Sequence, residues 1–352
     1  RCHLMTLAID VRSLCDARPS GVGHALYETL NAWPQSHEEL VLFSCGRRTP
    51  QLPRTILQRQ NVRLAHRKLP NKLANTLIAL GLLRLEHIIG SSIDVVWFPN
   101  TGFIPRTHAR TVVTVHDLAF HFLPKTYTWK DRLRHTITRA ISTIKNADDV
   151  IAISQSTAQD VLRLAPKGRV HTVLHGVDHD HFNIRTQPGD TTFLQYYGIR
   201  RPYILFLATI EPRKNVPSLI EAFDAVASTH CTLQLVIAGG RGWKRRSFER
   251  ALKTSVQRNR IKVIEYVDDE ARPALLRQAR ALCLPSRYEG FGMQILEAMA
   301  CGTPVVCSHN SSLPEVGGTA PIYVRAMNVR ELACTLEHIL SSSDLHERCR
   351  EN

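Results

Sequence analysis

The sequence lacks several features that would place it in a special class of protein. No hydrophobic run approaches the roughly 18 apolar residues that a membrane-spanning helix requires. There is no low-complexity tract and no repeat with a period of about 20 to 50 residues, which excludes solenoid and repeat architectures. The nine cysteines form no C-x-x-C pair. Cys301, Cys307 and the others are therefore predicted to be reduced thiols packed as small hydrophobic groups.

Acidic charge is also scarce relative to basic charge. The 352 residues include 45 Lys and Arg but only 31 Asp and Glu, a formal net charge of +14. The larger part of this excess lies in residues 1–190. A basic surface indicates an anionic partner, which could be nucleic acid, acidic lipid or a phosphorylated substrate. Composition alone does not choose among the three.

Short apolar segments rich in Val and Ile alternate with helical patterns along most of the chain, as in strands covered on both faces. The expected strands are 4–10, 40–44, 94–98, 111–116, 149–153, 170–174, 203–209, 233–238, 261–264, 281–285 and 304–307. The expected helices are 21–33, 71–89, 129–145, 156–164 (capped by Ser154), 216–228, 247–257, 270–279, 292–300 and 328–341, with another beginning at Ser312. Such alternation predicts parallel sheets of the α/β class.

The alternation is interrupted once, over the polar, Gly- and Pro-containing segment 176–202, which is the best linker candidate. We therefore expect two doubly wound, Rossmann-like domains, 1–190 and 191–352. Ligands of such sheets bind beyond the carboxyl ends of the strands. With two such sheets facing each other, a central cleft is the expected site.

Three motifs follow expected strands. Gly21 and Gly23 open a helix and suit the approach of a phosphate, although an ordinary strand-to-helix turn explains them too, and Leu26 leaves the G-x-G-x-x-G fingerprint incomplete. His116 ends a strand, where its ring could contact sugar hydroxyls or phosphate. In residues 211–215 (EPRKN), Arg213 and Lys214 suit a diphosphate, against the alternative of a solvated basic loop.

The most informative segment is SRYEGFGMQILEAMACGTPVV, residues 286–306. Gly290 and Gly292 permit a tight approach, and the helix that they start offers free N–H donors and a positive dipole end. Ionised Glu accepts hydrogen bonds only, so Glu289 and Glu297 suit sugar hydroxyls beside a phosphate. The simpler alternative is that Glu297 faces solvent and Glu289 favours the helix dipole.

These residues resemble the glycosyltransferase family 4 group, which are retaining enzymes of the GT-B fold. Glu289 and Glu297 have the family's E-x7-E spacing, and a series of motifs follows the family's order over most of the chain. These are RPSGVG (18–23), VHDLAF (115–120), VIAISQST (150–157), LHGVD (174–178), EPRKN (211–215), IAGGRGW (237–243), YVDDE (266–270), YEGFG (288–292), EAMACGTPVV (297–306) and SSLPEV (311–316).

The resemblance implies a nucleoside-diphosphate sugar bound mainly by the second domain and a glycan or lipid-linked acceptor bound mainly by the first. It implies that Arg213 and Lys214 hold the diphosphate, Glu289 the transferred sugar and Glu297 the ribose. His116 would reach the reaction centre. The remaining donor-binding positions implied are Gly21, Gly23, Gly290, Phe291 and Gly292.

The nearest subgroup is bacterial and mannosyltransferase-like, acting in O-antigen or other surface polysaccharide synthesis. His24 stands where many relatives carry Arg, and Gln294-Ile295 replaces a Pro-rich pair. We expect no metal and no other cofactor, because Arg213, Lys214 and the helix start at Gly292 would stabilise the leaving diphosphate. Asp178-His179-Asp180 has the spacing of a metal motif but lies in the expected linker, so it is assigned no metal.

Two other classes of function remain open from the residues. One is a nucleotide-sugar-binding protein without catalysis, and the other is a basic nucleic-acid-binding protein. The second predicts interleaved aromatic and basic residues, which the sequence does not show, so no nucleic-acid partner is expected. A cytoplasmic enzyme in peripheral contact with an anionic membrane is expected instead. The amphipathic stretch 71–89 is assigned to burial against the sheet rather than to that contact.

Overall fold

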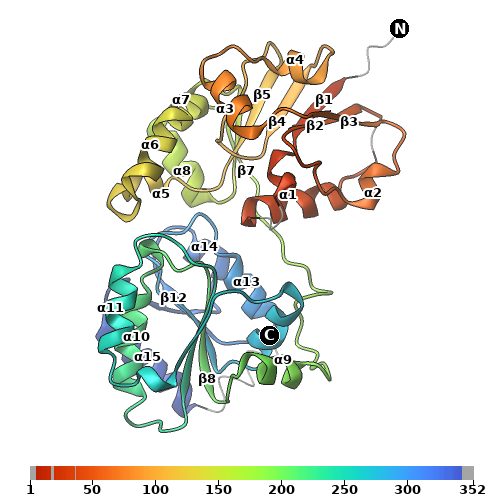
Figure 1. Ribbon diagram of the computed structural model, residues 1–352. Coiled ribbons are helices and arrows are strands. Elements are labelled where there is room, and N and C mark those ends of the chain that lie inside the picture. The colour runs from red at the N-terminus through yellow and green to blue at the C-terminus, as the bar shows by residue number, and fades with distance from the viewer. Residues whose placement is uncertain (1–4, 17–19, 36, 343–352) are drawn as a thin grey trace. The chain divides into compact units, whose positions relative to one another are not determined.

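The computed structural model describes residues 5–16, 20–35 and 37–342. Leu4 of the first expected strand and Arg18 and Pro19 of the first glycine motif lie outside these residues. Contacts between residues divide the chain into two units. The first contains residues 1–118 and 130–174, and the second contains residues 119–129 and 175–352. The expectation of two doubly wound, Rossmann-like domains is confirmed by the sheets of these units, shown in Figure 1.

The first unit contains a seven-stranded parallel sheet in the order β3-β2-β1-β4-β5-β6-β7. The strands are β1 (Thr6–Asp10), β2 (Glu39–Cys45), β3 (Val62–Arg67), β4 (Val95–Phe98), β5 (Arg110–Val115), β6 (Asp149–Ala152) and β7 (Val170–Thr172). The helices are α1 (Gly21–Asn31), α2 (Arg54–Leu57), α3 (Asn71–Ala79), α4 (Leu85–Ile89), α7 (Ala140–Asn146) and α8 (Gln155–Leu164), with α6 (Trp129–Ile137) beginning at the unit's edge.

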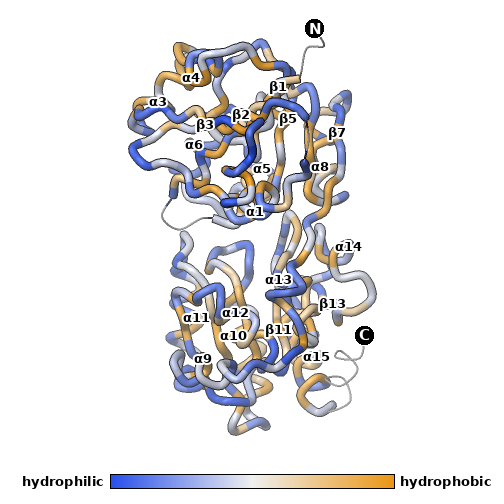
Figure 2. The backbone as a smooth tube through the Cα atoms, turned by 90° about the vertical axis from the view of Figure 1, so that its right-hand side faces the viewer, coloured by the Kyte–Doolittle hydropathy of each residue, from blue (hydrophilic) through white to orange (hydrophobic). Residues whose placement is uncertain are grey.

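Alternate residues of these strands face opposite sides of the sheet, and each side has its own core. Ala8 of β1 packs with Ala74 of α3 and with the buried residues of α4. Its neighbour Ile9 packs with Leu26 and Leu30 of α1 and Ile56 of α2. Because helices cover both faces of the sheet, side chains on both sides of each strand are buried. The strands are therefore almost continuously apolar. Hydrophobic and hydrophilic stretches accordingly alternate along the chain in Figure 2.

The second unit repeats the same winding with six parallel strands in the order β10-β9-β8-β11-β12-β13. They are β8 (Tyr203–Leu207), β9 (Gln234–Ala238), β10 (Ile261–Ile264), β11 (Ala281–Leu284), β12 (Val305–Ser308) and β13 (Ile322–Val324). Figure 1 shows α10 (Val216–Val226), α11 (Arg246–Thr254) and α15 (Val329–Ser341) on one side of β8 and β12. On the other side lie α9 (Asp190–Tyr197) and α13 (Met293–Ala300), and the unit also contains α12 (Arg272–Arg277) and α14 (Leu313–Gly317).

A short segment between β5 and β6 belongs to the second unit. Residues 119–129 contain α5 (Ala119–Phe122) and the 3-10 turn η2 (Pro124–Thr126). The indole Nε1–H of Trp243 donates to the carbonyl oxygen of Thr126 at 2.8 Å, and the Trp243 ring lies 5.3 Å from that of Tyr127. Lys244 donates to the carbonyl oxygen of Lys125 at 2.7 Å. This segment is therefore fixed by residues that follow β9.

Several expected elements differ from the structure. The expected helix 71–89 is wrong as a single element, because α3 ends at Ala79 and Gly81 adopts a φ of +74° before α4 begins. The expected helix 129–145 also divides, at Arg139, whose φ is +54°. The linker expectation is wrong for residues 190–197, which form α9, with Leu194 buried. The strands β3 and β13 were not expected. Among the described residues, no helix is long and apolar enough to cross a membrane.

Candidate functional site

The candidate site of the second unit lies at the carboxyl ends of two adjacent strands. β8 pairs with β11 in parallel, so the loops that follow these strands leave the same edge of the sheet. Residues 211–215 follow β8 and residues 286–292 follow β11. The two loops are joined by backbone contacts. Arg287 donates its amide to the carbonyl oxygen of Arg213 at 2.7 Å, and Arg213 Nη1 donates to that of Tyr288 at 3.0 Å.

The centre of this site is a buried cluster of ion pairs around Glu289. Lys214 Nζ donates to Glu289 Oε1 at 2.6 Å, and Arg213 Nη1 donates to Glu289 Oε2 at 2.8 Å. Ser286 Oγ also donates to Oε1, at 2.6 Å. The Arg213 Nε atom lies 2.6 Å from Glu211 Oε1. The structure therefore brings three of the predicted residues together, and it pairs the two cations with carboxylates rather than leaving them facing outward.

The cluster of two cations and two carboxylates is neutral overall. Burial alone would raise the pKa of Glu289, but Lys214 and Arg213 outweigh it and lower that pKa to about 2. Burial lowers the pKa of Lys214, although Glu289 partly opposes this effect. The side chains of Lys214 and Arg213 are only 7% and 15% exposed. Their charged groups are thus held in fixed positions before any ligand binds, which is the arrangement that electrostatic catalysis requires.

The loop 286–292 is itself braced by the loop that follows β12. The amide of Glu289 donates to Ser311 Oγ at 2.9 Å. The hydroxyl of Ser312 lies 3.0 Å from the carbonyl oxygen of Glu289 and 2.8 Å from that of Phe291, and can donate to either. Because β12 is the next strand of the sheet, its loop leaves the same edge. These serines belong to the predicted SSLPEV segment, but their bracing role was not predicted.

Glycine is required where this loop becomes α13. Gly292, the residue before the helix, has a φ of +101°, and a Cβ there would lie 2.7 Å from Leu313 Cδ2. Phe291 is buried at 5% exposure and its ring contacts that of His175 edge-on at 5.1 Å. Gly290, which completes the expected Gly-Phe-Gly turn, is also buried. The turn is therefore built as the sequence suggested, with the first amides of α13 behind Gly292.

Glu297 lies in the second turn of α13 and is also buried, at 4% exposure. Its Oε1 accepts a hydrogen bond from Arg272 Nη2 at 2.5 Å, whereas Oε2 is buried without a hydrogen-bond partner among the described residues. The alternative that Glu297 faces solvent is therefore wrong. Arg272, at the start of α12, was missed by sequence reasoning. Nothing in its local sequence marks it, because its partner lies 25 positions further along the chain.

The remaining predicted residues lie in the first unit, at the carboxyl edge of its sheet. His116 follows β5, and its Nε2–H donates to the carbonyl oxygen of Pro99, which follows β4, at 2.8 Å. Burial lowers the pKa of His116, against the opposing effect of that hydrogen bond. Gly21 and Gly23 are in the first turn of α1, and Ser20 caps this helix by accepting from the Gly23 amide at 3.3 Å.

Comparison with known proteins identifies the class. Residues 19–181 match the family model described as Glycosyltransferase Family 4, and residues 197–352 match the model described as Glycosyl transferases group 1. O-antigen chain mannosyltransferase B of Escherichia coli is 30% identical over 336 residues, which cover 92% of this chain and 87% of that protein. The chain therefore belongs to the family 4 glycosyltransferases.

Solved structures share the fold at low sequence identity. A sucrose-phosphate synthase from Thermosynechococcus elongatus has a TM-score of 0.73 at 18% identity, covering 99% of this chain and 93% of its own. The Anabaena protein HepE, solved in complex with UDP-glucose, has a TM-score of 0.69 at 17% identity, covering 99% and 94%. These structures confirm the expected GT-B fold. The family models and the E. coli relative confirm the expected activity of a hexosyltransferase.

Proposed function

We propose that this glycosyltransferase moves a mannosyl group, with retention of configuration, from a nucleoside-diphosphate sugar to a glycan or lipid-linked acceptor. The observation that carries the proposal is the buried cluster of Arg213, Lys214 and Glu289, together with the Glu297 carboxylate oxygen that has no hydrogen-bond partner among the described residues. Mannose is supported by the E. coli relative, whose name describes an O-antigen mannosyltransferase. Surface polysaccharide synthesis is supported by the same relative.

Arg213 and Lys214 would stabilise the diphosphate as it leaves. Lys214 gives one of its three N–H donors to Glu289 Oε1 at 2.6 Å, which fixes the direction of the ammonium. A preorganised cation costs no rearrangement when negative charge develops on the leaving oxygen. The first amides of α13, behind Gly292, would supply further donors. We propose that these groups suffice and that no metal ion is required.

The two glutamates would recognise hydroxyl groups, as expected from the sequence. Glu289 accepts three hydrogen bonds from Lys214, Arg213 and Ser286, so a carboxylate with about four acceptor sites keeps room for one sugar hydroxyl. Glu297 Oε2 has no partner in the described part of the chain and would accept from a ribose hydroxyl. We propose that His116, neutral and with Nε2–H turned to Pro99, contacts the transferred sugar.

The test is a transferase assay with the purified chain. GDP- and UDP-linked hexoses are offered with a mannose-containing oligosaccharide acceptor, in the presence of EDTA, and the anomeric configuration of the product is read by NMR. We expect mannosyl transfer with retention that EDTA does not reduce. Transfer of another hexose would overturn the mannose assignment, and an inverted product would overturn retention. Donor binding without transfer or hydrolysis would favour the alternative of a silent nucleotide-sugar-binding protein.

Matched variants connect the assay to the cluster. Lys214→Met should lower the turnover number by about 100-fold or more, which is the typical cost of removing one preorganised donor. Arg250→Gln removes an exposed cation of α11 in the same unit and serves as the control. If Lys214→Met folds and turns over at a rate near that of Arg250→Gln, the cluster does not stabilise the leaving group.

A further inference from the structure

A second candidate site lies in the first unit, on the side of β5 that faces α3 and α7. It is a pocket of about 240 Å³ between the end of α3, the segment before β5 and the α6–α7 junction. This volume is below the roughly 300 to 1,000 Å³ that is typical of sites for drug-sized ligands, so the pocket suits one small metabolite. None of the residues predicted for the glycosyl transfer reaction lines it.

The polar end of this pocket lies at the edge of the sheet opposite to His116. Thr107 and Thr111 flank the start of β5, and Asn146 precedes the start of β6. His116, which is predicted to reach the reaction centre, follows the other end of β5. Substrates of doubly wound sheets bind beyond the carboxyl ends of the strands. A ligand in this pocket would therefore be neither the sugar donor nor the reacting end of the acceptor.

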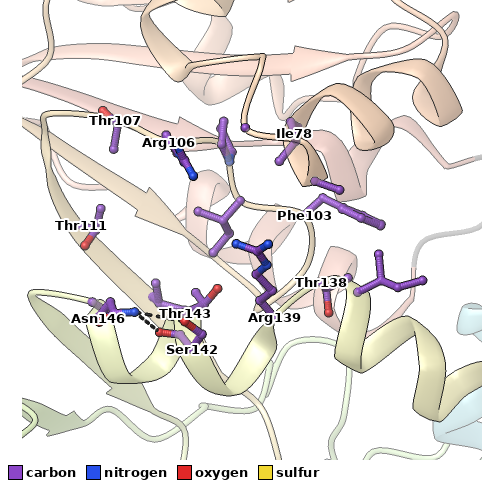
Figure 3. A pocket seen from close by; sticks show the side chains of 17 residues that line it. Ile78, Phe103, Arg106, Thr107, Thr111, Thr138, Arg139, Ser142, Thr143 and Asn146 are labelled. Carbon is purple, nitrogen blue, oxygen red and sulfur yellow. Dashed lines mark hydrogen bonds between the residues drawn. The ribbon is translucent and has the colours of Figure 1, made fainter.

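Two arginines give the pocket a positive charge. Figure 3 shows the guanidinium groups of Arg106 and Arg139 pointing into it. Neither guanidinium forms an ion pair or a hydrogen bond within the part of the chain that the structure describes. The carboxylates of Glu86 and Asp148, which contact the lining, accept hydrogen bonds from threonines instead. The pocket thus has two cations without a matching anion.

Both arginines are carried by an anchored main chain. The carbonyl oxygen of Arg106 accepts from the amide of Leu85 at 2.9 Å, and that of Arg139 accepts from the amide of Thr143 at 2.8 Å. The Arg106 guanidinium lies against Gly81, where a Cβ would be 3.0 Å from Cζ. Two arginines that reach one pocket from different segments suit a phosphate group, because planar guanidinium groups bind phosphate through two parallel hydrogen bonds.

The rest of the lining suits a sugar rather than a bare anion. Asn146 Nδ2 donates to Ser142 Oγ at 3.1 Å and to the Ser142 carbonyl oxygen at 2.8 Å, as the dashed line in Figure 3 indicates. No described residue donates to Asn146 Oδ1 or bonds the hydroxyl of Thr143. A ligand hydroxyl could therefore both donate and accept here. Ile78 and Phe103 add an apolar wall, against which the C–H face of a sugar ring could pack.

We propose that this pocket binds a hexose monophosphate, with Arg106 and Arg139 on the phosphate and Thr143 and Asn146 on the sugar hydroxyls. The name sugar-phosphate pocket is used below for the residues that line it. The two arginines select a compact anion, and the hydroxyl and amide groups beside the apolar wall select the sugar attached to it. The proposal rests on contacts of the first unit alone and does not depend on donor binding in the second unit.

The experiment is isothermal titration calorimetry of the full chain. Mannose 1-phosphate, mannose 6-phosphate, free mannose and inorganic phosphate are titrated separately, first alone and then with a saturating nucleoside diphosphate, which would occupy the cluster of Arg213 and Lys214. We expect at least one of the two mannose phosphates to bind about tenfold or more tightly than inorganic phosphate, because the sugar adds hydrogen bonds. Its affinity should be the same with and without the nucleoside diphosphate, and free mannose should not bind measurably.

Variants assign this binding to the sugar-phosphate pocket. Arg106→Gln/Arg139→Gln should bind the mannose phosphate about 100-fold more weakly, since each hydrogen bond to a charged group contributes about tenfold or more. Thr143→Val should weaken it by about two- to tenfold and leave inorganic phosphate unaffected. The control is Arg132→Gln/Arg134→Gln, which removes the same charge from exposed positions of α6 outside the lining and should bind like the unmodified chain. Melting temperatures verify that each variant is folded.

Three outcomes would overturn the proposal. Mannose phosphates that bind no more tightly than inorganic phosphate would show that the pocket does not recognise a sugar. Equal loss of affinity in the control pair would mean that binding follows net charge rather than the sugar-phosphate pocket. Binding that disappears when the nucleoside diphosphate is added would place the ligand in the second unit. Nucleoside-diphosphate binding, measured on the same samples, keeps a failure here distinct from a failure of the proposed transfer reaction.

Discussion

Arg272 donates a hydrogen bond to Oε1 of Glu297, whereas Oε2 is buried and has no hydrogen-bond partner within residues 5–16, 20–35 and 37–342. The donated bond is 2.5 Å long, and the Arg272 side chain is 20% exposed whereas that of Glu297 is 6% exposed. An ionised carboxylate buried without this partner would be costly. Arg272 therefore fixes the orientation of the Glu297 carboxylate, and under the proposed function Oε2 is the atom that would accept a ligand hydroxyl. Arg272 is in this sense a positioning residue for Glu297.

The first prediction concerns ribose recognition. In the unmodified chain, replacing a nucleoside diphosphate by its 2′- or 3′-deoxy analogue should weaken binding by about tenfold or more at one of the two positions, because a hydrogen bond to a charged group is lost. Glu297→Gln and Arg272→Met should both reduce this discrimination, as measured by calorimetry. The control is Arg325→Met, which removes an exposed arginine paired with Glu331 at 3.0 Å in the same unit. If Arg272→Met keeps full discrimination, it does not position Glu297.

The second prediction separates stability from catalysis at the ion-pair cluster. Glu289→Gln leaves Lys214 buried without its charge partner and should lower the free energy of unfolding by about 3 to 5 kcal/mol. The double variant Lys214→Met/Glu289→Gln should be less destabilised than the sum of the single variants, which a double-mutant cycle in urea measures. Additive effects would mean that the two side chains do not interact.

Arg277→Met provides the matched comparison for that cycle. It breaks another buried pair of the second unit, in which Arg277 Nη2 lies 2.5 Å from Asp190 Oδ1. We expect a similar loss of stability but a normal turnover number per folded molecule. If turnover in Arg277→Met falls as far as in Lys214→Met, the loss of activity reports instability rather than the loss of a catalytic cation.

The third prediction concerns acid stability. The pKa of Glu289 falls from an ordinary value of 4.5 to about 2 in the folded chain. The unfolded chain therefore takes up a proton at Glu289 as the pH falls below 4.5, whereas the folded chain does so only near pH 2. The stability from this carboxylate is fully present above pH 4.5 and is lost between pH 4.5 and 2. Its size is about 3 kcal/mol at most, at 1.36 kcal/mol per unit of pKa.

Urea unfolding at a series of pH values tests this directly. Glu289→Gln should flatten the dependence of the free energy of unfolding on pH between 4.5 and 2. Glu337→Gln, which changes a glutamate side chain that is 44% exposed, should leave the curve unchanged in shape. A curve for Glu289→Gln that is as steep as that of the unmodified chain would contradict the low pKa.

The fourth prediction concerns the protonation state of His116. Burial lowers the pKa of its ring, and the carbonyl oxygen of Pro99 can only accept, so the proton of the neutral ring is on Nε2. ¹⁵N NMR of labelled protein should find this neutral tautomer at pH 6.5, where an unperturbed histidine is half protonated. The lowered pKa means that stability from the neutral ring is present above pH 6.5 and is lost as the pH falls. Half protonation of His116 at pH 6.5 would contradict the burial effect.

The fifth prediction concerns the turn before α13. Gly292→Ala should be destabilising and should lower activity, because its φ of +101° is unfavourable for alanine and the new Cβ would meet Leu313 Cδ2. The double variant Gly292→Ala/Leu313→Ala should recover only part of the lost activity, since the unfavourable φ of residue 292 persists. Gly176→Ala is the control, because a Cβ at Gly176 meets no atom within 4 Å. Equal melting temperatures for the two alanine variants would show that the turn tolerates a side chain.

The sequence predicted those parts of the fold that local hydrophobicity determines. β8 and β11 are short apolar runs, and both were expected close to their observed bounds. β3 (VRLAHR) was missed because it is an edge strand, half-buried and rich in polar residues, and so lacks the continuous apolar pattern. α9 was missed because its stability comes partly from the buried Asp190–Arg277 pair rather than from an apolar stripe.

The candidate site was predicted as a set of residue types but not as a set of contacts. The sequence placed Arg213 and Lys214 after one expected strand and Glu289 after another. The structure shows that these strands are neighbours and joins the three side chains by ion pairs. That Glu211 and Glu289 neutralise the cations was not expected, because the sequence shows which residues are charged but not how they pair. Arg272 was not found for the same reason, since its partner Glu297 is distant in sequence.

The segment containing α5 and η2 has a practical consequence for anyone who divides this enzyme. Because residues 119–129 belong with the later unit, the polypeptide passes from one unit to the other three times, at 118/119, 129/130 and 174/175. A fragment ending at residue 174 would contain Tyr127 but not Trp243. The complementary fragment would contain Trp243 but lack the segment 119–129 whose Tyr127 ring contacts it. The two halves should consequently be obtained in good yield only when expressed together, and a single proteolytic nick after residue 175 should leave them associated.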